Sequence, residues 1–100
     1  MSTIVLKLFV MGHSPKSQRA VSDLRQLFDE RFNGAYELNV IDIRARPQEA
    51  ETDRVLATPT LVREKPLPVR RLIGDLSDAQ QILAGLELVP GQEGDADVTS

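Results

Sequence analysis

The sequence predicts one α/β domain whose elements follow the order β-α-β-α-β-β-α. A nearly continuous apolar run, TIVLKLFVMG over residues 3–12, is typical of a strand buried on both faces. Apolar residues then recur at helical spacing up to the helix stop at Asn33-Gly34. Short β-branched runs separated by prolines indicate a hairpin in the second half. A length of 100 residues fits a single domain of this kind.

Each element has its own local signal. Ser14 is a favourable N-cap residue, and Pro15 suits the first position of the first helix. YELNVIDI, residues 36–43, predicts the second strand, and Pro47 opens a weaker helix over residues 47–57 that has few apolar side chains. TLVR and PVRRLI, on either side of EKPLP, predict the two strands of the hairpin. The first two strands, joined by a helical crossover, are expected to be parallel.

The last helix is the ambiguous element. Ser77 followed by Gln80 has the pattern of a capping box, ahead of an apolar stripe formed by Ile82, Leu83, Leu86 and Val89. Gly85 would lie inside this helix and cost roughly 1 kcal/mol relative to Ala. The same stretch, LAGLELV, also alternates as a strand would. Sequence physics alone favours one stable fold with a weak last helix, because fold switching is rare.

Composition excludes several function classes. The net charge is −3, and residues 90–100 contain three acids and no base, so the rest of the chain is neutral. We therefore expect a domain over residues 1–89, an acidic disordered tail over 90–100, and no nucleic-acid partner. The absence of cysteine and the single histidine exclude a Cys-based or multi-His metal site. No apolar run approaches the ~20 residues of a membrane span, and there is no signal-peptide pattern, so we expect no membrane partner and a cytoplasmic protein.

The predicted order is the thioredoxin layout, in which the turn after the first strand holds two cysteines. The corresponding turn in this sequence is GHSPKS. His13 could act as a general base, but no carboxylate neighbours it in sequence, so a solvated loop histidine is favoured. An alternative function is a glutathione-binding, transferase-type domain that uses Ser14 together with Asp75 and Ser77 of GDLSD. Such transferases need a second helical domain, and the N-cap role already explains Ser14, so the residues favour a binding module without catalytic residues or cofactors.

A basic cluster lies in the hairpin region. It comprises Arg63, Lys65, Arg70 and Arg71, opposed only by Glu64. Arginine pairs well with carboxylates at protein interfaces. The cluster is therefore either a partner-binding surface or a solvated face of the hairpin, and the sequence leaves both open.

Residues 6–88 contain a specific set of stretches, namely VIDI, VLATPTL, PLPVRRLIGDLSD and GLEL, together with LKLFVMGHSPKSQRAVSDL. In these stretches the chain resembles the KaiB family of circadian-clock proteins. The resemblance implies a non-enzymatic partner of a KaiC-type ATPase that binds the N-terminal ATPase ring of KaiC. It also implies sequestration of KaiA and displacement of a sensor histidine kinase that shares the fold. The turn MGHSPKS, the stretch VREKPLP and Phe9 depart from the usual family pattern and leave the KaiA contact open.

The resemblance further implies two folds for one sequence. A ground-state dimer or tetramer would have the order β-α-β-β-α-α-β, whereas the thioredoxin-like monomer would bind KaiC. Six positions are expected to matter for the switch, namely Thr58, Pro59, Pro66, Pro68, Gly85 and Glu87. Slow X-Pro isomerisation is expected to contribute. Gly85→Ala is expected to raise the binding form by strengthening the last helix, and Glu87→Arg is expected to do the same through the helix dipole.

The family pattern also indicates which residues contact the partner. The predicted residues are Arg19, Arg46, Asp53, Arg70 and Arg71. Charge reversal at Arg70 and Arg71 is expected to weaken KaiC binding while leaving the circular dichroism spectrum unchanged.

Overall fold

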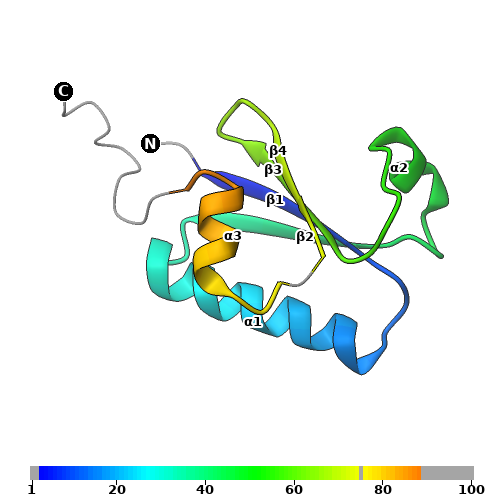
Figure 1. The fold of residues 1–100 in the computed structure, drawn as a ribbon, viewed down its shortest axis with the longest axis horizontal. Coiled ribbons are helices and arrows are strands. Elements are labelled where there is room, and N and C mark those ends of the chain that lie inside the picture. The colour runs from blue at the N-terminus through cyan, green and yellow to red at the C-terminus, as the bar shows by residue number, and fades with distance from the viewer. Residues whose placement is uncertain (1–2, 75, 89–100) are drawn as a thin grey trace.

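The computed structural model describes residues 3–74 and 76–88, and its elements follow the predicted order (Figure 1). Their bounds are β1 Ile4–Val10, α1 Pro15–Phe32, β2 Tyr36–Asp42, α2 Pro47–Thr52, β3 Thr60–Lys65, β4 Arg70–Ile73 and α3 Ala79–Gly85. The thioredoxin-like prediction is therefore confirmed. Asp75, Val89 and the predicted acidic tail lie outside the described residues.

The four strands form one mixed sheet in the order β2-β1-β3-β4. β1 and β2 are parallel, as predicted for strands joined by a helical crossover, and β3 pairs antiparallel with both β1 and β4. β1 is a central strand of this sheet, and its side chains are buried in core clusters on both faces, which explains why its sequence is almost continuously apolar.

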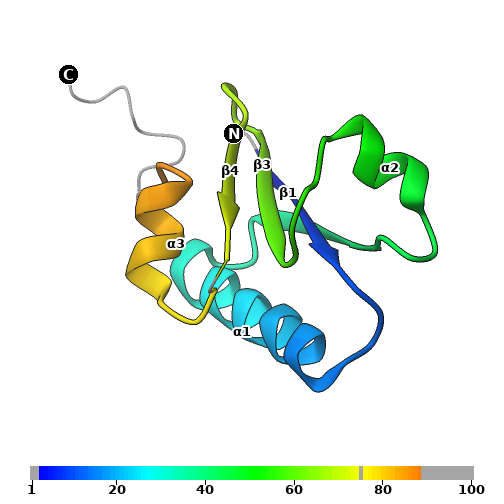
Figure 2. The same ribbon diagram turned by 45° about the vertical axis from the view of Figure 1, so that its right-hand side comes forward.

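Helices cover the sheet on both faces (Figures 1 and 2). On one face, β1 side chains such as Leu6 and Leu8 pack with α1 and α3 in the main core. On the other face, α2 covers a smaller cluster formed by Phe9, Ile41, Ala50 and Val62. Successive residues of a strand point to opposite faces, so β1 contributes to both clusters.

Both ends of α1 match the sequence prediction. The Ser14 hydroxyl accepts a hydrogen bond from the Ser17 N–H at 3.1 Å and so satisfies one of the donors at the start of the helix. Asn33 ends the helix in the left-handed region, with φ of 54°.

The predicted capping box at the start of α3 is wrong by one residue. The N-cap is Asp78, whose carboxylate accepts from the backbone N–H groups of Gln80 and Gln81 at 2.9 and 3.3 Å. An ionised carboxylate can accept both bonds at once, so Asp78 caps the helix in place of Ser77.

The end of α3 also differs from the prediction. Gly85 is the last residue of the helix, not an interior one. The left-handed residue is Glu87, with φ of 56°. The N–H of Glu87 binds the Ala84 carbonyl, and the N–H of Leu88 binds the Leu83 carbonyl, which is the Schellman arrangement. The carbonyls that α3 leaves unpaired are thus partly satisfied without glycine at the turn.

α2 is shorter than the predicted span of residues 47–57. It ends at Thr52, and Arg54 then adopts a positive φ of 55°. Only Ala50 of this helix is buried, so few apolar contacts favour its extension. The peptide bonds Thr58-Pro59, Lys65-Pro66 and Leu67-Pro68 that border or follow β3 are cis.

Candidate functional site

Arg63 of β3 does not belong to a solvated basic face. The residue is only 4% exposed. Its Nη1 donates to the carbonyls of Leu86 and Glu87 at 2.6 and 3.2 Å, and its Nη2 donates to the carbonyl of Pro68 at 2.6 Å. Burial lowers the pKa of Arg63, and the positive charge of Arg70 acts in the same direction. Arg63 therefore fastens the end of α3 and the β3–β4 turn to the sheet.

Arg70 and Arg71 point to opposite faces of β4. The Arg70 Nε lies 3.0 Å from a Glu87 carboxylate oxygen, beside the end of α3. The expectation for Glu87→Arg left out this ion pair, which the substitution would replace with a repulsion. Arg71 donates to the carbonyls of Asp53 and Arg54, just after α2. The predicted basic cluster is thus divided between two faces of the sheet.

Lys7 connects the sheet to the end of α2. Its Nζ lies 3.1 Å from an Asp53 carboxylate oxygen and 3.0 Å from a Glu64 carboxylate oxygen. The hydrogen bond with Glu64, more than that with Asp53, raises the pKa of Lys7. The sequence prediction missed this role, although a cation inside a buried strand needs such a partner and is itself a signal.

The stretch from Asp53 to Thr60 runs beside β4, because Arg71 binds its start and Ile73 pairs with Thr60 at its end. Two large apolar side chains are exposed in this region. They are Leu56 of this stretch, at 92%, and Ile73 of β4, at 50%. We call this region the α2–β4 surface, defined by Asp53, Arg54, Leu56, Arg71 and Ile73. Its mixture of a fixed arginine and exposed apolar side chains is typical of a protein-binding surface.

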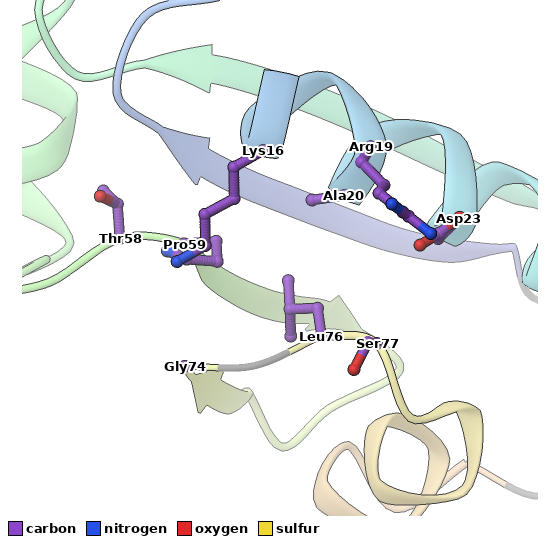
Figure 3. A pocket seen from close by; sticks show the side chains of 9 residues that line it. All are labelled: Lys16, Arg19, Ala20, Asp23, Thr58, Pro59, Gly74, Leu76 and Ser77. Atoms are coloured by element: carbon purple, nitrogen blue, oxygen red, sulfur yellow. The ribbon is translucent and has the colours of Figure 1, made fainter. Parts of the chain in front are cut away.

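A groove of about 520 Å³ lies at the same end of the sheet, on the opposite face, which α1 covers (Figure 3). α1 forms one wall, and Thr58, Pro59, Gly74, Leu76 and Ser77 form the other. It is lined by Lys16, Arg19, Ala20, Asp23, Thr58, Pro59, Gly74, Leu76 and Ser77. Figure 3 shows the Lys16 side chain extending from α1 towards Pro59. The lining combines apolar side chains, among them Leu76, with charged and hydroxyl side chains.

A smaller hollow of about 120 Å³ adjoins this groove and is lined by Ser14, Thr58 and Pro59 among others. The turn that holds cysteines in thioredoxins therefore does face the Thr58-Pro59 turn. The Ser14 hydroxyl caps α1 and donates to the Ser17 hydroxyl at 3.1 Å. Because the sequence has no cysteine, thiol–disulfide exchange is not available to this site.

The predicted partner residues thus occupy four places. Asp53 and Arg71 meet at the α2–β4 surface, while Arg46 lies at the start of α2 and pairs with Glu49 at 3.2 Å. Arg70 lies at the end of α3, and Arg19 lines the groove.

The predicted switch positions all lie in the second half of the chain. Thr58 and Pro59 line the groove, and Pro66 and Pro68 lie between β3 and β4. Gly85 and Glu87 form the end of α3.

Within residues 3–74 and 76–88, no cluster of histidine and carboxylate side chains could hold a metal ion. In the same residues, no helix is long and apolar enough to cross a bilayer.

The mixed sheet, its helices and the groove define a domain of the thioredoxin-like class. Comparison with solved structures agrees. The N-terminal domain of Synechococcus elongatus SasA superimposes with a TM-score of 0.72 at 31% identity, covering 87% of this chain and 86% of that one. Mitochondrial thioredoxin 3 from Saccharomyces cerevisiae matches with a TM-score of 0.62 at 18% identity, over 87% of this chain and 79% of that one, which shows the fold alone.

The sequence identifies the family within that class. Residues 7–88 match the KaiB domain. The circadian clock oscillator protein KaiB of Synechococcus elongatus is 50% identical over 95 residues, which cover 95% of this chain and 93% of that protein. The KaiB of Prochlorococcus marinus strain MIT 9312 is 52% identical over 87 residues, or 87% of this chain and 83% of that protein. The chain belongs to the KaiB family of clock proteins.

Proposed function

We propose that this protein is a non-enzymatic regulator that binds the N-terminal ATPase ring of a KaiC-type ATPase. The observation that supports it most is the identity of about half of all residues with KaiB proteins over nearly the whole chain. Buried structural positions alone do not account for such identity, because more than half of the described residues are exposed or partly exposed. A surface that recognises a shared partner is the simplest reason for it.

The α2–β4 surface is the proposed contact with that ATPase. Leu56 provides an exposed apolar anchor, and Arg71 is held in place by the carbonyls of Asp53 and Arg54. A fixed arginine loses little side-chain entropy on binding, and an exposed leucine gains burial, so the two together suit an interface centre.

Four finer proposals accompany this one. The likeness to the SasA domain supports competition between this protein and a sensor kinase of the same fold for one partner surface. Sequestration of KaiA and a cytoplasmic location are also proposed, and membership of the KaiB family supports them. A second, oligomeric fold with the order β-α-β-β-α-α-β is also proposed, in equilibrium with the thioredoxin-like form.

The test compares the same substitution at two exposed leucines, one inside the α2–β4 surface and one outside it. Leu56→Glu removes the anchor of the α2–β4 surface, and Leu67→Glu makes the same change at the β3–β4 turn, where the side chain is 74% exposed. Both variants are expected to keep their stability because neither side chain is buried. Each is mixed with a KaiC-type ring and ATP and followed by size-exclusion chromatography with light scattering.

We expect Leu56→Glu to reduce complex formation at least ~10-fold, equivalent to about 1.4 kcal/mol, and Leu67→Glu to leave it unchanged. Equal binding by wild type and Leu56→Glu would reject the α2–β4 surface. Failure of the wild type to bind any KaiC-type ring would reject the proposed function itself.

A further inference from the structure

β2 forms one edge of the sheet, and its outer side is open. Within residues 3–74 and 76–88, β2 pairs only with β1. At the opposite edge, β4 has four residues, and Arg71 binds the carbonyls of the stretch beside it. β2 is longer, with seven residues from Tyr36 to Asp42, and contains neither proline nor lysine, which often protect an edge. Such a strand is a template for pairing with another strand.

The pairing with β1 determines which backbone groups lie on the open side. The Ile43 N–H, just after β2, donates to a β1 carbonyl at 2.9 Å. In a parallel ladder, alternate residues of a strand bond to the same neighbour, so the odd-numbered residues of β2 bond to β1. The outward N–H and C=O groups therefore belong to the even-numbered residues, which are Tyr36, Leu38, Val40 and Asp42.

Two of these outward groups are already bonded within the chain. The Tyr36 N–H donates to a carbonyl of the preceding turn at 2.8 Å. The Asp42 carbonyl accepts from two N–H groups of the following turn at 3.0 and 2.9 Å. Tyr36 thus offers only its carbonyl to another strand, and Asp42 offers only its N–H, whereas Leu38 and Val40 offer both groups.

We propose that β2 pairs antiparallel with β2 of a second copy of this chain, around a two-fold axis at Asn39. Leu38 would then face Val40 of the second copy, and the two residues would exchange both backbone hydrogen bonds. Tyr36 would face Asp42, so the free carbonyl of one meets the free N–H of the other. β2 and the α2–β4 surface lie at opposite edges of the sheet, so this dimer leaves the proposed ATPase contact accessible.

The bonded groups select this register over its neighbours. An axis at Leu38 would set the Val40 carbonyl opposite the bonded N–H of Tyr36. An axis at Val40 would set the Leu38 N–H opposite the bonded carbonyl of Asp42. Either shift leaves a free backbone group without a partner, whereas the axis at Asn39 pairs the whole strand.

The side chains of β2 are compatible with a second copy. Asn39 would face the same residue across the axis, and an amide both donates and accepts, whereas two like charges would repel. Glu37, which accepts from the Asn39 amide at 3.2 Å, would face the uncharged Ile41. On the other face, Val40 is 39% exposed and Leu38 is partly buried, and each would cover the other. A second copy is therefore the partner that this edge fits.

Single cysteines test the register, because the chain has none of its own. In a non-hydrogen-bonded antiparallel pair the Cα atoms are about 4.5 Å apart, within the range of a disulfide. Asn39→Cys is expected to form a disulfide-linked dimer, with oxidised glutathione as the oxidant, at least ~10-fold faster than Glu37→Cys. Glu37→Cys is the matched control, because residue 37 is also exposed on β2 but would lie roughly 14 Å from its copy.

The full chain without cysteine provides a second measurement. Sedimentation equilibrium is expected to show a dimer, and the amides of Leu38 and Val40 should gain protection from hydrogen exchange as the protein concentration rises. Asn39→Asp places two like charges at the axis and is expected to weaken the dimer at least ~3-fold. Asn39→Thr removes the same amide without adding charge and is expected to retain the dimer.

Three results would overturn the proposal. They are equal cross-linking of Asn39→Cys and Glu37→Cys, protection of β2 amides that is independent of protein concentration, and loss of protection at Leu88 in the cross-linked dimer. The Leu88 amide binds the Leu83 carbonyl in this fold, so its loss would assign the dimer to the other proposed fold. None of these results requires a KaiC-type ATPase, so they are distinguishable from failure of the proposed function.

Discussion

Replacing Arg63 with methionine is expected to release the end of α3 from the sheet. Methionine keeps the buried stem but removes the three hydrogen bonds to the carbonyls of Leu86, Glu87 and Pro68. A hydrogen bond to a charged group contributes about 1.5–3 kcal/mol. Glu87 and Pro68 are exposed, so water can replace two of the bonds, whereas Leu86 is fully buried.

The net loss then follows from two opposing effects. The buried carbonyl of Leu86 loses its charged donor, which destabilises the folded state. The variant also avoids the desolvation penalty of burying the guanidinium, which offsets part of that loss. We therefore expect Arg63→Met to lower the free energy of unfolding by about 2 kcal/mol. Arg63→Lys keeps the charge but has no forked geometry, so about half of this loss is expected to remain.

Two measurements check the prediction. Urea denaturation followed by circular dichroism gives the global loss, and amide hydrogen exchange shows where protection disappears. The amide of Leu88, which binds the Leu83 carbonyl, should lose protection before the amides of β1 do. Lys65→Met removes an exposed cation from the same strand and is the control. A loss below about 0.5 kcal/mol, or one equal to that of Lys65→Met, would refute the role given to Arg63.

Three further outcomes follow from local geometry. Glu87→Gly should be about 1 kcal/mol more stable than Glu87→Ala by urea denaturation, because both lose the ion pair with Arg70 but only Gly adopts the positive φ without cost; equal stabilities would contradict the Schellman assignment. A Cβ at Gly85 would lie 3.0 Å from the Leu72 Cδ1, so Gly85→Ala should be more favourable by at least ~0.5 kcal/mol in a Leu72→Val background than in the wild type, and a double-mutant cycle measures the difference. The folded state raises the pKa of Lys7 above 10.5, so its ionised form stabilises the fold fully below about pH 10.5. This stability is lost as the pH rises through the folded pKa. The decrease in the urea midpoint at alkaline pH should therefore be smaller in Lys7→Met than in the wild type.

The first half of the chain could be predicted closely because its signals are local. An apolar run, an N-cap serine and an Asn-Gly stop each act within a few residues, and β1, α1 and β2 start and end within two residues of the predicted positions. The order of all seven elements could be predicted for the same reason. The helix caps and loop conformations of the second half could not be predicted in this way.

The second half depends on contacts between residues far apart in the sequence. Arg63 binds carbonyls 23 and 24 residues away, and Lys7 pairs with Asp53 across 46 residues. No local pattern shows such partners, so the sequence predicts one basic cluster that includes Arg63 and Arg70. In the structure, Arg63 binds carbonyls at the end of α3, whereas Arg70 pairs with the Glu87 carboxylate. The N-cap of α3 is Asp78 and not the predicted Ser77. Both residue types are acceptable N-caps, and only the backbone conformation before the helix decides between them.

The groove beside α1 is built from both halves of the chain, which matters for the proposed equilibrium between two folds. One wall of the groove comes from α1, in the half that both folds would share, and the other comes from Thr58, Pro59, Gly74, Leu76 and Ser77, in the half that would rearrange. The groove would therefore exist only in the thioredoxin-like form. A ligand that binds one of two states shifts the population towards it by its difference in affinity. Any ligand held between α1 and the Thr58-Pro59 turn would therefore favour the form proposed to bind the ATPase.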